Sequence, residues 1–464
     1  MSPLDTEEEA NQPRGGFSRA VQKLSLPGSV ALKNRDFRLY WFGYVTEVSG
    51  QQMLWVTQGW LIYELSGSAI LLGVAGLARA LPSTILTFIG GALADRLDQR
   101  RVLIAVQAVQ MLLLGSLATL TLSGQVEVWH LILIISASSG AQSIEGPARQ
   151  AIFPRLIPRT ALMDAVALNS TVHPGTRFLA PLLAGLIMAQ ARILTGDALL
   201  GAAILFYFTA AGYVVNACFL HAIRLETVVR EARRTSVAHD MREGVQFVIQ
   251  NRIFGSLILM TYCGSFFGWS VQSLFPIFAK DIFNGGAFEL GLLYSTLGAG
   301  SLLGAAAAAN LAGVRGRGRL IAWCFLVQAL LLGLFAVTPV FAIALMLLIL
   351  LGVAHAIFNV TAQSTLQYMV PSDYRGRVMG IWVMTHTTVQ PVGQFQMGAI
   401  AGFAFAEVAV AVGSIAMIGF ALLVVFPNSS LRALQLKPPE GAEEAESDQA
   451  RLGSSLSVGN ETQA

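Results

Sequence analysis

Residues 69–101 read AILLGVAGLARALPSTILTFIGGALADRLDQRR, and this stretch decides the fold class. Its first part, residues 69–93, contains a single charged side chain, that of Arg79. As a helix it is long enough to cross the hydrocarbon core of a bilayer, which takes roughly 20 residues. A polar segment with Asp95 and three arginines then ends the apolar run. An apolar helix followed by a basic turn is typical of a multi-pass membrane protein.

The same alternation of long apolar runs and short polar interruptions continues along the chain. Of the 464 residues, 54% are hydrophobic and 12% are charged, whereas soluble domains have about 25% charged residues. The mean hydropathy is +0.61. The runs are too long and too uniformly apolar for barrel strands, so they must cross lipid as helices. We predict an all-α membrane protein with twelve transmembrane helices, at about residues 39–63, 69–93, 102–122, 129–150, 165–190, 197–221, 253–279, 288–312, 320–338, 340–362, 377–400 and 403–426.

The distribution of basic residues predicts the orientation in the membrane. With the N-terminus placed in the cytoplasm, 26 of the 30 Lys and Arg residues fall in segments on that side. Arg192 and Lys280 fall on the other side, and Arg79 and Arg177 fall within apolar runs. Cytoplasmic loops of membrane proteins are enriched in Lys and Arg. We therefore predict a multi-pass inner-membrane protein with both termini in the cytoplasm.

The longest interior polar segment divides the chain into two halves that resemble each other. Pro158 follows the fourth apolar run and Pro371 follows the tenth, 213 residues later, and Gly185 and Gly398 keep the same offset. Paired six-helix halves are typical of transporters. We predict two pseudo-symmetric six-helix bundles. The expected boundaries are 1–30 for a cytoplasmic tail, 31–222 for the first bundle, 223–250 for a cytoplasmic loop, 251–428 for the second bundle and 429–464 for a disordered cytoplasmic tail.

The sequence gives no basis for catalysis or for binding a cofactor, a metal or nucleic acid. The net charge of +3 is too small to indicate nucleic acid. The three cysteines lie far apart in apolar runs, which argues against a zinc site or a disulfide framework. No GxxxxGK[ST], HExxH or GxSxG motif occurs. We expect a monomeric protein that is not an enzyme.

The loop from Gly91 to Arg101, Gly-Ala-Leu-Ala-Asp-Arg-Leu-Asp-Gln-Arg-Arg, resembles the signature of the major facilitator superfamily. Shorter motifs are similar to the branch with enterobactin exporters and macrolide-efflux proteins: NRDFR at 34–38, YELSGS at 63–68, GPARQ at 146–150 and RGR at 375–377. The resemblance covers about residues 30–428. It implies the major facilitator fold and export of drug-like or siderophore-like amphipathic molecules, driven by the proton gradient. Asp98 and Gln99 depart from the usual Gly and Arg, and the second-half copy GVRGRGR lacks the Asp.

This loop is the predicted gate. Its side chains could pair across the two halves and hold one face of the protein closed, which requires bistable packing rather than catalysis. Arginines that only set the topology are the alternative. The residues assigned to the gate are Gly91, Asp95, Arg96, Arg100 and Arg101.

A second charged group is predicted at the cytoplasmic end of the fourth helix. Glu145 and Arg149 lie four residues apart, so their side chains share one helix face. In the expected fold this face lies close to the gate loop. We predict a charge network that links the loop to this helix, and we include Arg375 and Arg377 of the second half in it. A simple interfacial ion pair is the alternative.

Three charged residues lie well inside predicted spans, where charges are costly and usually functional. They are Glu47, Arg79 and Arg177. We predict that Glu47 and Arg177 can pair across the cavity of the first half. Protonation of Glu47 would then free Arg177 for an anionic group of the substrate. A static buried ion pair, or a Glu47 bonded to neighbouring Gln and Thr side chains, is the alternative.

Amide and aromatic side chains within the spans predict a cavity for bulky amphipathic molecules. Among the membrane histidines, His386 is the best candidate for this cavity, because imidazole titrates near neutrality. A helix-to-helix hydrogen bond is the alternative role. The amides assigned to the cavity are Gln51, Gln58, Gln363 and Gln390. Helix kinks are expected at Pro181, Gly185 and Pro391.

Together these features predict a secondary transporter that works by alternating access, with a small-molecule substrate, protons as the coupling ion and the lipid bilayer as partners. A lipid or lysolipid translocator, or a nutrient importer, would keep this architecture and change the cargo. A membrane receptor or an integral-membrane enzyme would be a different class. An enzyme should show a reactive constellation at one interface, and a receptor does not need a duplicated half with a charged loop.

Overall fold

The computed structural model describes residues 30–96, 98–223, 237–311, 316–432 and 434, without the side chains of 87–96, 237–240, 430 and 432. All regular elements in these ranges are helical. The first bundle contains η1 (Ala31–Lys33), α2 (Arg35–Ser66), α3 (Ala69–Arg96), α4 (Gln99–Leu122), α5 (Val128–Ile152), η2 (Phe153–Arg155), η3 (Arg159–Ala161), α6 (Leu162–Ser170), α7 (Val172–Thr195) and α8 (Ala198–Ala222).

The second bundle has a less regular backbone. It contains α9 (Val237–Gln250), α10 (Arg252–Cys263), η4 (Gly264–Gly268), η5 (Trp269–Leu274), α11 (Phe275–Ile277), η6 (Phe278–Ile282), α12 (Ala287–Asn310), α13 (Arg317–Val337), α14 (Phe341–Met369), α15 (Ser372–Met384), η7 (Thr385–Val389), α16 (Gln390–Phe403), α17 (Ala406–Phe420), η8 (Ala421–Val425) and α18 (Ser429–Arg432). The segments η4, η6, η7 and η8 are π-helical turns, and η5 is a 3₁₀ helix.

Local sequence explains where several of these helices begin and end. The Asn34 side chain accepts hydrogen bonds from the first backbone N–H groups of α2, and Asp98 and Asp197 do the same for α4 and α8. Gly67 and Gly196 end α2 and α7 in the left-handed conformation, which glycine adopts without steric cost. Short turns between long helices make sequence neighbours antiparallel, as a bundle that crosses a membrane repeatedly requires.

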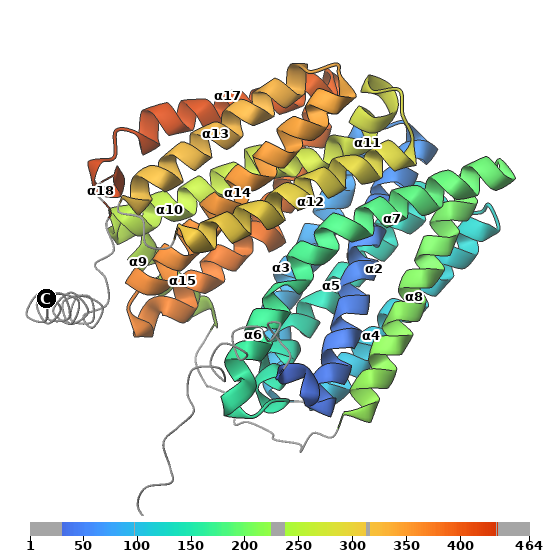
Figure 1. Ribbon diagram of the computed structural model, residues 1–464, viewed down its shortest axis with the longest axis horizontal. Coiled ribbons are helices and arrows are strands. Elements are labelled where there is room, and N and C mark those ends of the chain that lie inside the picture. The colour runs from blue at the N-terminus through green and yellow to red at the C-terminus, as the bar shows by residue number, and fades with distance from the viewer. Residues whose placement is uncertain (1–29, 97, 224–236, 312–315, 433, 435–464) are drawn as a thin grey trace, which may run out of the picture.

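The two bundles lie side by side, with the first at the lower right of Figure 1 and the second at the upper left. They meet along α7 and α12 and along α3 and α16. They diverge toward the edge where α6, α9 and α15 lie (Figure 1). We call this edge the basic end, because the described arginines Arg155 and Arg375 lie there, and the opposite edge, with Glu64 and Lys280, the far end.

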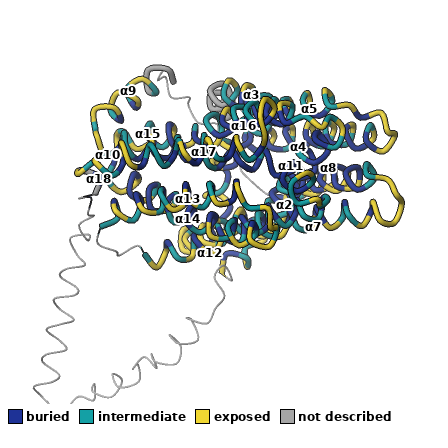
Figure 2. The backbone as a smooth tube through the Cα atoms, turned by 90° about the horizontal axis from the view of Figure 1, so that it is seen from above, coloured by how far each residue is buried: buried dark blue, intermediate teal, exposed yellow. Residues whose placement is uncertain are grey.

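The surface of the bundles is suited to lipid. Figure 2 shows buried residues inside the groups of helices and exposed residues toward the outside. Large apolar side chains are exposed on many helices, among them Leu112, Leu133, Ile193, Leu303, Met346 and Leu423. In a bilayer, these side chains contact hydrocarbon rather than water.

Nine helical segments in the described ranges are long and apolar enough to span a membrane. Three further segments of similar length are more polar: α2, α5 and the continuous run from Ser372 to Phe403. They carry the polar residues Glu47, Glu145 and His386 away from their ends, and α2 and the run from Ser372 also carry charged residues near their ends. The all-helical membrane fold is confirmed, and the count of twelve spans remains a prediction.

Glycines allow the closest contacts between the two bundles. A Cβ added at Gly398 of α16 would lie 2.6 Å from the Ala69 carbonyl oxygen and 2.7 Å from Gly73 Cα on α3. A Cβ added at Gly185 of α7 would lie 2.6 Å from the Ala287 carbonyl oxygen of α12. Gly185 and Gly398 thus occupy equivalent inter-bundle contacts, in agreement with the repeat that their offset indicates.

The two prolines predicted to kink helices also lie at these contacts. Pro181 is inside α7, and its carbonyl oxygen lies 2.7 Å from the position of a Cβ at Gly291. Pro391 is in the first turn of α16, directly after the π-helical turn η7, and its carbonyl oxygen lies 2.8 Å from a Cβ position at Gly76. Whether these positions bend during transport remains a prediction.

Candidate functional site

A cluster of buried polar side chains lies inside the first bundle. Arg149 Nη2 lies 2.6 Å from Glu47 Oε2, and Arg149 also bonds Glu145, four residues before it on α5. The Gln107 amide lies 3.1 Å from a carboxylate oxygen of each glutamate, and Asn216 donates to Glu47. We call these residues, Glu47, Gln107, Glu145, Arg149 and Asn216, the buried charge network. They come from α2, α4, α5 and α8, so the network joins four helices.

Aromatic side chains cover the cation of this network. The Arg149 guanidinium lies 4.5 Å from the ring centre of Tyr44 and 5.8 Å from that of Tyr40. Tyr44 Oη also shares a hydrogen bond of 2.9 Å with His173 Nε2 on α7. The network therefore connects through Tyr44 to a helix that contacts the second bundle.

The network contains two carboxyl groups and one guanidinium, so it carries one excess negative charge when both acids are ionised. Uncompensated buried charge is unfavourable. Arg149 Nη1 and Gln107 Oε1 are buried and lack a hydrogen-bond partner among the described residues. Binding one proton would neutralise the network, which makes it chemically suited to take up and release a proton.

The predicted pairing of Glu47 with Arg177 is wrong. Glu47 pairs with Arg149, whereas the Arg177 guanidinium lies 5.4 Å from the ring centre of Trp269 in the second bundle. The i, i+4 pairing of Glu145 and Arg149 is present. Sequence reasoning missed Gln107 and Asn216, although each is an amide within an expected span, and that was a usable signal.

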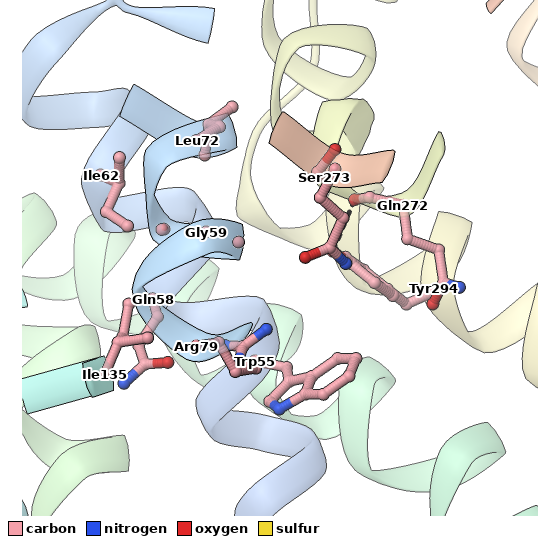
Figure 3. Close-up of a pocket in the computed structure, with 13 residues that line it drawn as sticks. Trp55, Gln58, Gly59, Ile62, Leu72, Arg79, Ile135, Gln272, Ser273 and Tyr294 are labelled. Atoms are coloured by element: carbon pink, nitrogen blue, oxygen red, sulfur yellow. Dashed lines mark hydrogen bonds between the residues drawn. The ribbon is translucent and has the colours of Figure 1, made fainter. Parts of the chain in front are cut away.

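A cavity lies between the two bundles (Figure 3). It encloses about 460 Å³ of empty space, including the part open to solvent. Figure 3 shows Trp55, Gln58 and Arg79 on the first bundle, with Gln272, Ser273 and Tyr294 reaching in from the second. The remaining lining residues are Gly59, Ile62, Leu72, Ala75, Gly76, Ile135 and Gln394.

Only some of the residues predicted to line the cavity lie in it or near it. Gln58 and Arg79 line the cavity, and the Arg79 guanidinium lies 4.5 Å from the ring centre of Trp55. Gln390 is buried nearby, and its carbonyl oxygen accepts a 3.0 Å hydrogen bond from Ser270 of η5. Gln51 bonds Gln142 at 2.7 Å inside the first bundle. Gln363 is half-buried on α14 and is not among the lining residues.

Two histidines lie within helical segments of the second bundle. His355 stacks on this indole with ring centres 3.6 Å apart, and its ring nitrogens approach Gln328 and Asn359. His386, in the π-helical turn η7, lies 3.4 Å from the Gln390 side chain. The contact of His355 with Gln328 joins α14 to α13, whereas the contact of His386 with Gln390 lies within one continuous helical run. A transport role for His386 remains a prediction.

The gate loop is described only in part. The side chains of Gly91, Asp95 and Arg96 lie outside the described residues, although the backbone of α3 continues to Arg96. Arg100 donates to the carbonyl oxygens of Leu220 and His221, at the end of α8. Arg101 lies 3.6 Å from Asp98 and is largely exposed. Both arginines thus contact the first bundle in this conformation, and pairing across the halves remains a prediction.

Arg375 and Arg377 are separate from the buried charge network. Arg377 pairs with Glu243 of α9 at 2.9 Å, beside a stacked pair of Phe247 and Tyr374 rings whose centres are 4.3 Å apart. Arg375 donates to the carbonyl oxygen of Val370 at 3.4 Å. The Arg377–Glu243 pair and the ring stack attach α9 to α15. The predicted single charge network is therefore two groups, one in each bundle.

At the far end, polar contacts join the two bundles. Lys280 of η6 lies 2.8 Å from Glu64 of α2, and Tyr63 donates a hydrogen bond to Asp281. The Lys280 ammonium also lies 5.8 Å from the Tyr63 ring centre. We call Tyr63, Glu64, Lys280 and Asp281 the far-end latch. Sequence reasoning did not find it, because its members lie more than 200 residues apart along the chain.

Comparison with known proteins places the chain among transporters. Residues 28–449 match the family described as transmembrane secretion effector. The MFS-type transporter YfiS of Bacillus subtilis is 24% identical over 82% of this chain and 91% of its own length. Enterobactin exporter EntS of Salmonella choleraesuis is 24% identical over 76% of this chain and 82% of its own length. Macrolide efflux protein A of Streptococcus pyogenes is 20% identical over 77% of this chain and 87% of its own length.

A solved structure agrees with the fold. The crystal structure of the nucleoside transporter NupG superposes with a TM-score of 0.64. It covers 87% of this chain and all of its own chain, at 14% sequence identity. At that identity the likeness concerns the arrangement of helices alone.

Proposed function

Because the chain belongs to the transmembrane secretion effector family of major facilitator transporters, we propose that it exports amphipathic small molecules in exchange for protons. It is a multi-pass membrane protein and a secondary transporter rather than an enzyme. The observation that carries the proposal of proton coupling is the buried charge network, with two carboxyl groups around one guanidinium.

The arrangement of the bundles supports alternating access. The far-end latch and the glycine contacts hold the bundles together on one side, while the bundles diverge toward the basic end (Figure 1). Positively charged ends of membrane helices face the cytoplasm. We infer that this is the inward-facing conformation of an inner-membrane protein whose termini are cytoplasmic.

The network suggests how a proton could change the conformation. Protonation of Glu47 would remove the negative charge that holds Arg149 Nη2 at 2.6 Å. Arg149 would then shift toward Glu145 and change its contact with the Tyr44 ring, 4.5 Å away. Tyr44 is bonded to His173 on α7. Since α7 packs against α12, this chain of contacts leads from the proton site to the interface between the bundles.

We expect Glu47→Gln to abolish proton-driven transport, with at least a tenfold loss, while leaving the protein folded. Glutamine keeps the size of the side chain and cannot ionise, so the network stays in its neutral form. The measurement is gradient-dependent efflux activity in everted membrane vesicles. Glu127→Gln, at an exposed carboxylate near the far end, is the matched control and should transport normally. Full proton-driven transport by Glu47→Gln would refute the coupling assignment.

The broader proposal is tested with everted vesicles that contain the wild-type protein and a panel of cationic dyes, macrolides, siderophores, amphipathic acids and lysolipids. We expect uptake of at least one compound into the vesicles that collapses when the proton gradient is dissipated. If none moves, the exporter proposal fails. If only lysolipids move, or if movement runs in the opposite direction, the translocator or the importer replaces it.

We expect the far-end latch to contribute to the transport cycle through charge pairing. Lys280→Glu would bring three carboxylates together at this end and should lower transport several-fold, because like charges oppose closure of the bundles. The double variant Glu64→Lys/Lys280→Glu restores an opposite-charge pair and should recover most of the rate. Arg192→Glu, at an exposed far-end position, controls for surface charge. Unchanged transport by Lys280→Glu, or no recovery in the double variant, would show that the latch is incidental.

A further inference from the structure

Two arginines at the interface between the bundles lack an anionic partner among the described residues. Arg79 of α3 lines the inter-bundle cavity, and Arg177 of α7 lies beside the same interface. Each guanidinium lies against an indole ring, Arg79 at 4.5 Å from the centre of Trp55 and Arg177 at 5.4 Å from that of Trp269. Within the described part of the chain, neither side chain has a hydrogen bond or an ion pair. Both are only partly accessible to solvent.

The acidic residues of the neighbouring helices have other partners. Glu47 and Glu145 bond Arg149 inside the first bundle, and Glu64 bonds Lys280 at the far end. The described lining of the cavity contains Arg79 and no carboxylate. The polar groups that accompany it are neutral amides and hydroxyls. The interface therefore has an excess of positive charge where the bundles face each other.

Both arginines face the same two elements of the second bundle. Gln272 and Tyr294 line the cavity with Arg79, and Tyr294 Oη donates a 2.7 Å hydrogen bond to the Gln272 carbonyl oxygen. Trp269, whose ring lies near Arg177, is three residues before Gln272 in η5. The backbone of α12 at Gly298, one turn after Tyr294, packs against the Arg177 carbonyl group. Trp269 is buried and stacked on His355, and neither it nor Arg177 lines the cavity, so Arg177 contributes its charge from beside the cavity.

This stretch has an irregular backbone. The π-helical turn η4 and the 3₁₀ helix η5 interrupt the segment between Arg252 and Ile282. Interrupted helices at membrane depth are tolerated where they line a cavity, and transporters build substrate sites from them. This irregular backbone is an observation independent of the arginines, and it lies at the same part of the interface between the bundles.

Guanidinium groups that lack a protein anion are costly in a low-dielectric setting, and the indole faces offset only part of that cost. The planar fork of arginine matches the geometry of a carboxylate or similar oxyanion. We propose that the inter-bundle cavity binds an amphipathic organic anion, with its acidic group at Arg79 and its apolar, aromatic body against Trp55 and Tyr294, while Arg177 adds positive charge beside the same interface. This substrate class rests on the proposed transport function. The positive charge of the cavity would disfavour organic cations.

A pair of fluorescent probes tests the charge preference without transport. Dansylglycine and dansylcadaverine share one aromatic group and end in a carboxylate and an ammonium, respectively. Binding to the purified full-length protein is measured by equilibrium dialysis and by energy transfer from tryptophan to dansyl. We expect wild-type protein to bind dansylglycine at least tenfold more tightly than dansylcadaverine. Equal affinity, tighter binding of dansylcadaverine or binding of neither probe would overturn the proposal.

Arginine variants locate the site. Arg79→Met should weaken dansylglycine binding roughly tenfold, as expected for loss of a charge-assisted contact. Arg177→Met should weaken it less, because Arg177 does not line the cavity. Both variants should leave dansylcadaverine binding unchanged or stronger. Arg79→Lys and Arg177→Lys keep the charge, should retain most of the anion preference and guard against loss of fold. Arg192→Met, at an exposed position on α7, controls for the loss of one arginine charge at the surface. Retention of the full anion preference in the methionine variants would overturn the assignment. The vesicle experiment tests the proposed export function independently of the binding of these probes.

Discussion

Arg149→Met is expected to destabilise the protein by about 3–5 kcal/mol and to abolish transport, because removing one partner of a buried ion pair leaves the other charges uncompensated. Arg149 is the only described cation in contact with Glu47 and Glu145. Without it, two carboxyl groups remain in the interior of the first bundle beside the donors Gln107 and Asn216. The measurement is the free energy of unfolding of the purified protein in detergent, together with transport in vesicles.

A double variant distinguishes the effect of the uncompensated charge on stability from the effect of lost side-chain packing. Arg149→Met/Glu47→Gln removes one of the two acids, so it should recover a substantial part of the lost stability while remaining inactive in proton-driven transport. Arg192→Met, at an exposed position on α7, should change stability little. Wild-type stability of Arg149→Met would show that the network is not an energetically coupled unit. A double variant that is less stable than Arg149→Met would lead to the same conclusion.

Gly398→Leu is expected to eliminate transport while both bundles fold. A leucine Cβ at this position would lie 2.6 Å from the Ala69 carbonyl oxygen and 2.7 Å from Gly73 Cα, and neither backbone atom can move without moving α3. The substitution should therefore force α3 and α16 apart and disfavour the conformation in which the far end is closed. We expect at least a tenfold loss of transport rate.

Spin-label distances give a direct readout of this opening. Labels at Leu194 on α7 and Phe403 on α16 occupy exposed far-end positions in different bundles, in a background with the three native cysteines replaced. The distance distribution should shift to longer values in Gly398→Leu. Gly419→Leu is the matched control, because no atom lies within 4 Å of a Cβ there. Normal transport and unchanged distances in Gly398→Leu would show that this close contact is not required for the cycle.

Sequence patterns predicted the fold class and the pairing of Glu145 with Arg149 for a simple reason. Hydropathy over one span and an i, i+4 spacing are local properties of the chain. The offset between Gly185 and Gly398 likewise predicted equivalent positions, and the structure places both at inter-bundle contacts.

The partner of Glu47 could not be predicted in the same way. Arg149 and Arg177 both lie in the first bundle, and the choice between them depends on how α2, α5 and α7 rotate about their axes. Hydropathy does not determine that rotation, because both the lipid-facing and the protein-facing sides of a membrane helix can be apolar. The far-end latch was missed for a different reason, the long separation of its partners along the chain. Its ion pair joins Glu64 to Lys280 across the two bundles.

Exchange of substrate for protons can be measured in proteoliposomes that contain the purified protein, a pH-sensitive dye in the lumen and an outwardly directed gradient of a transported substrate, with no initial pH difference. We expect substrate efflux to acidify the lumen in wild-type liposomes and to leave the luminal pH unchanged with Glu47→Gln. Substrate efflux from wild-type liposomes without a change in luminal pH, or with alkalinisation, would rule out proton exchange.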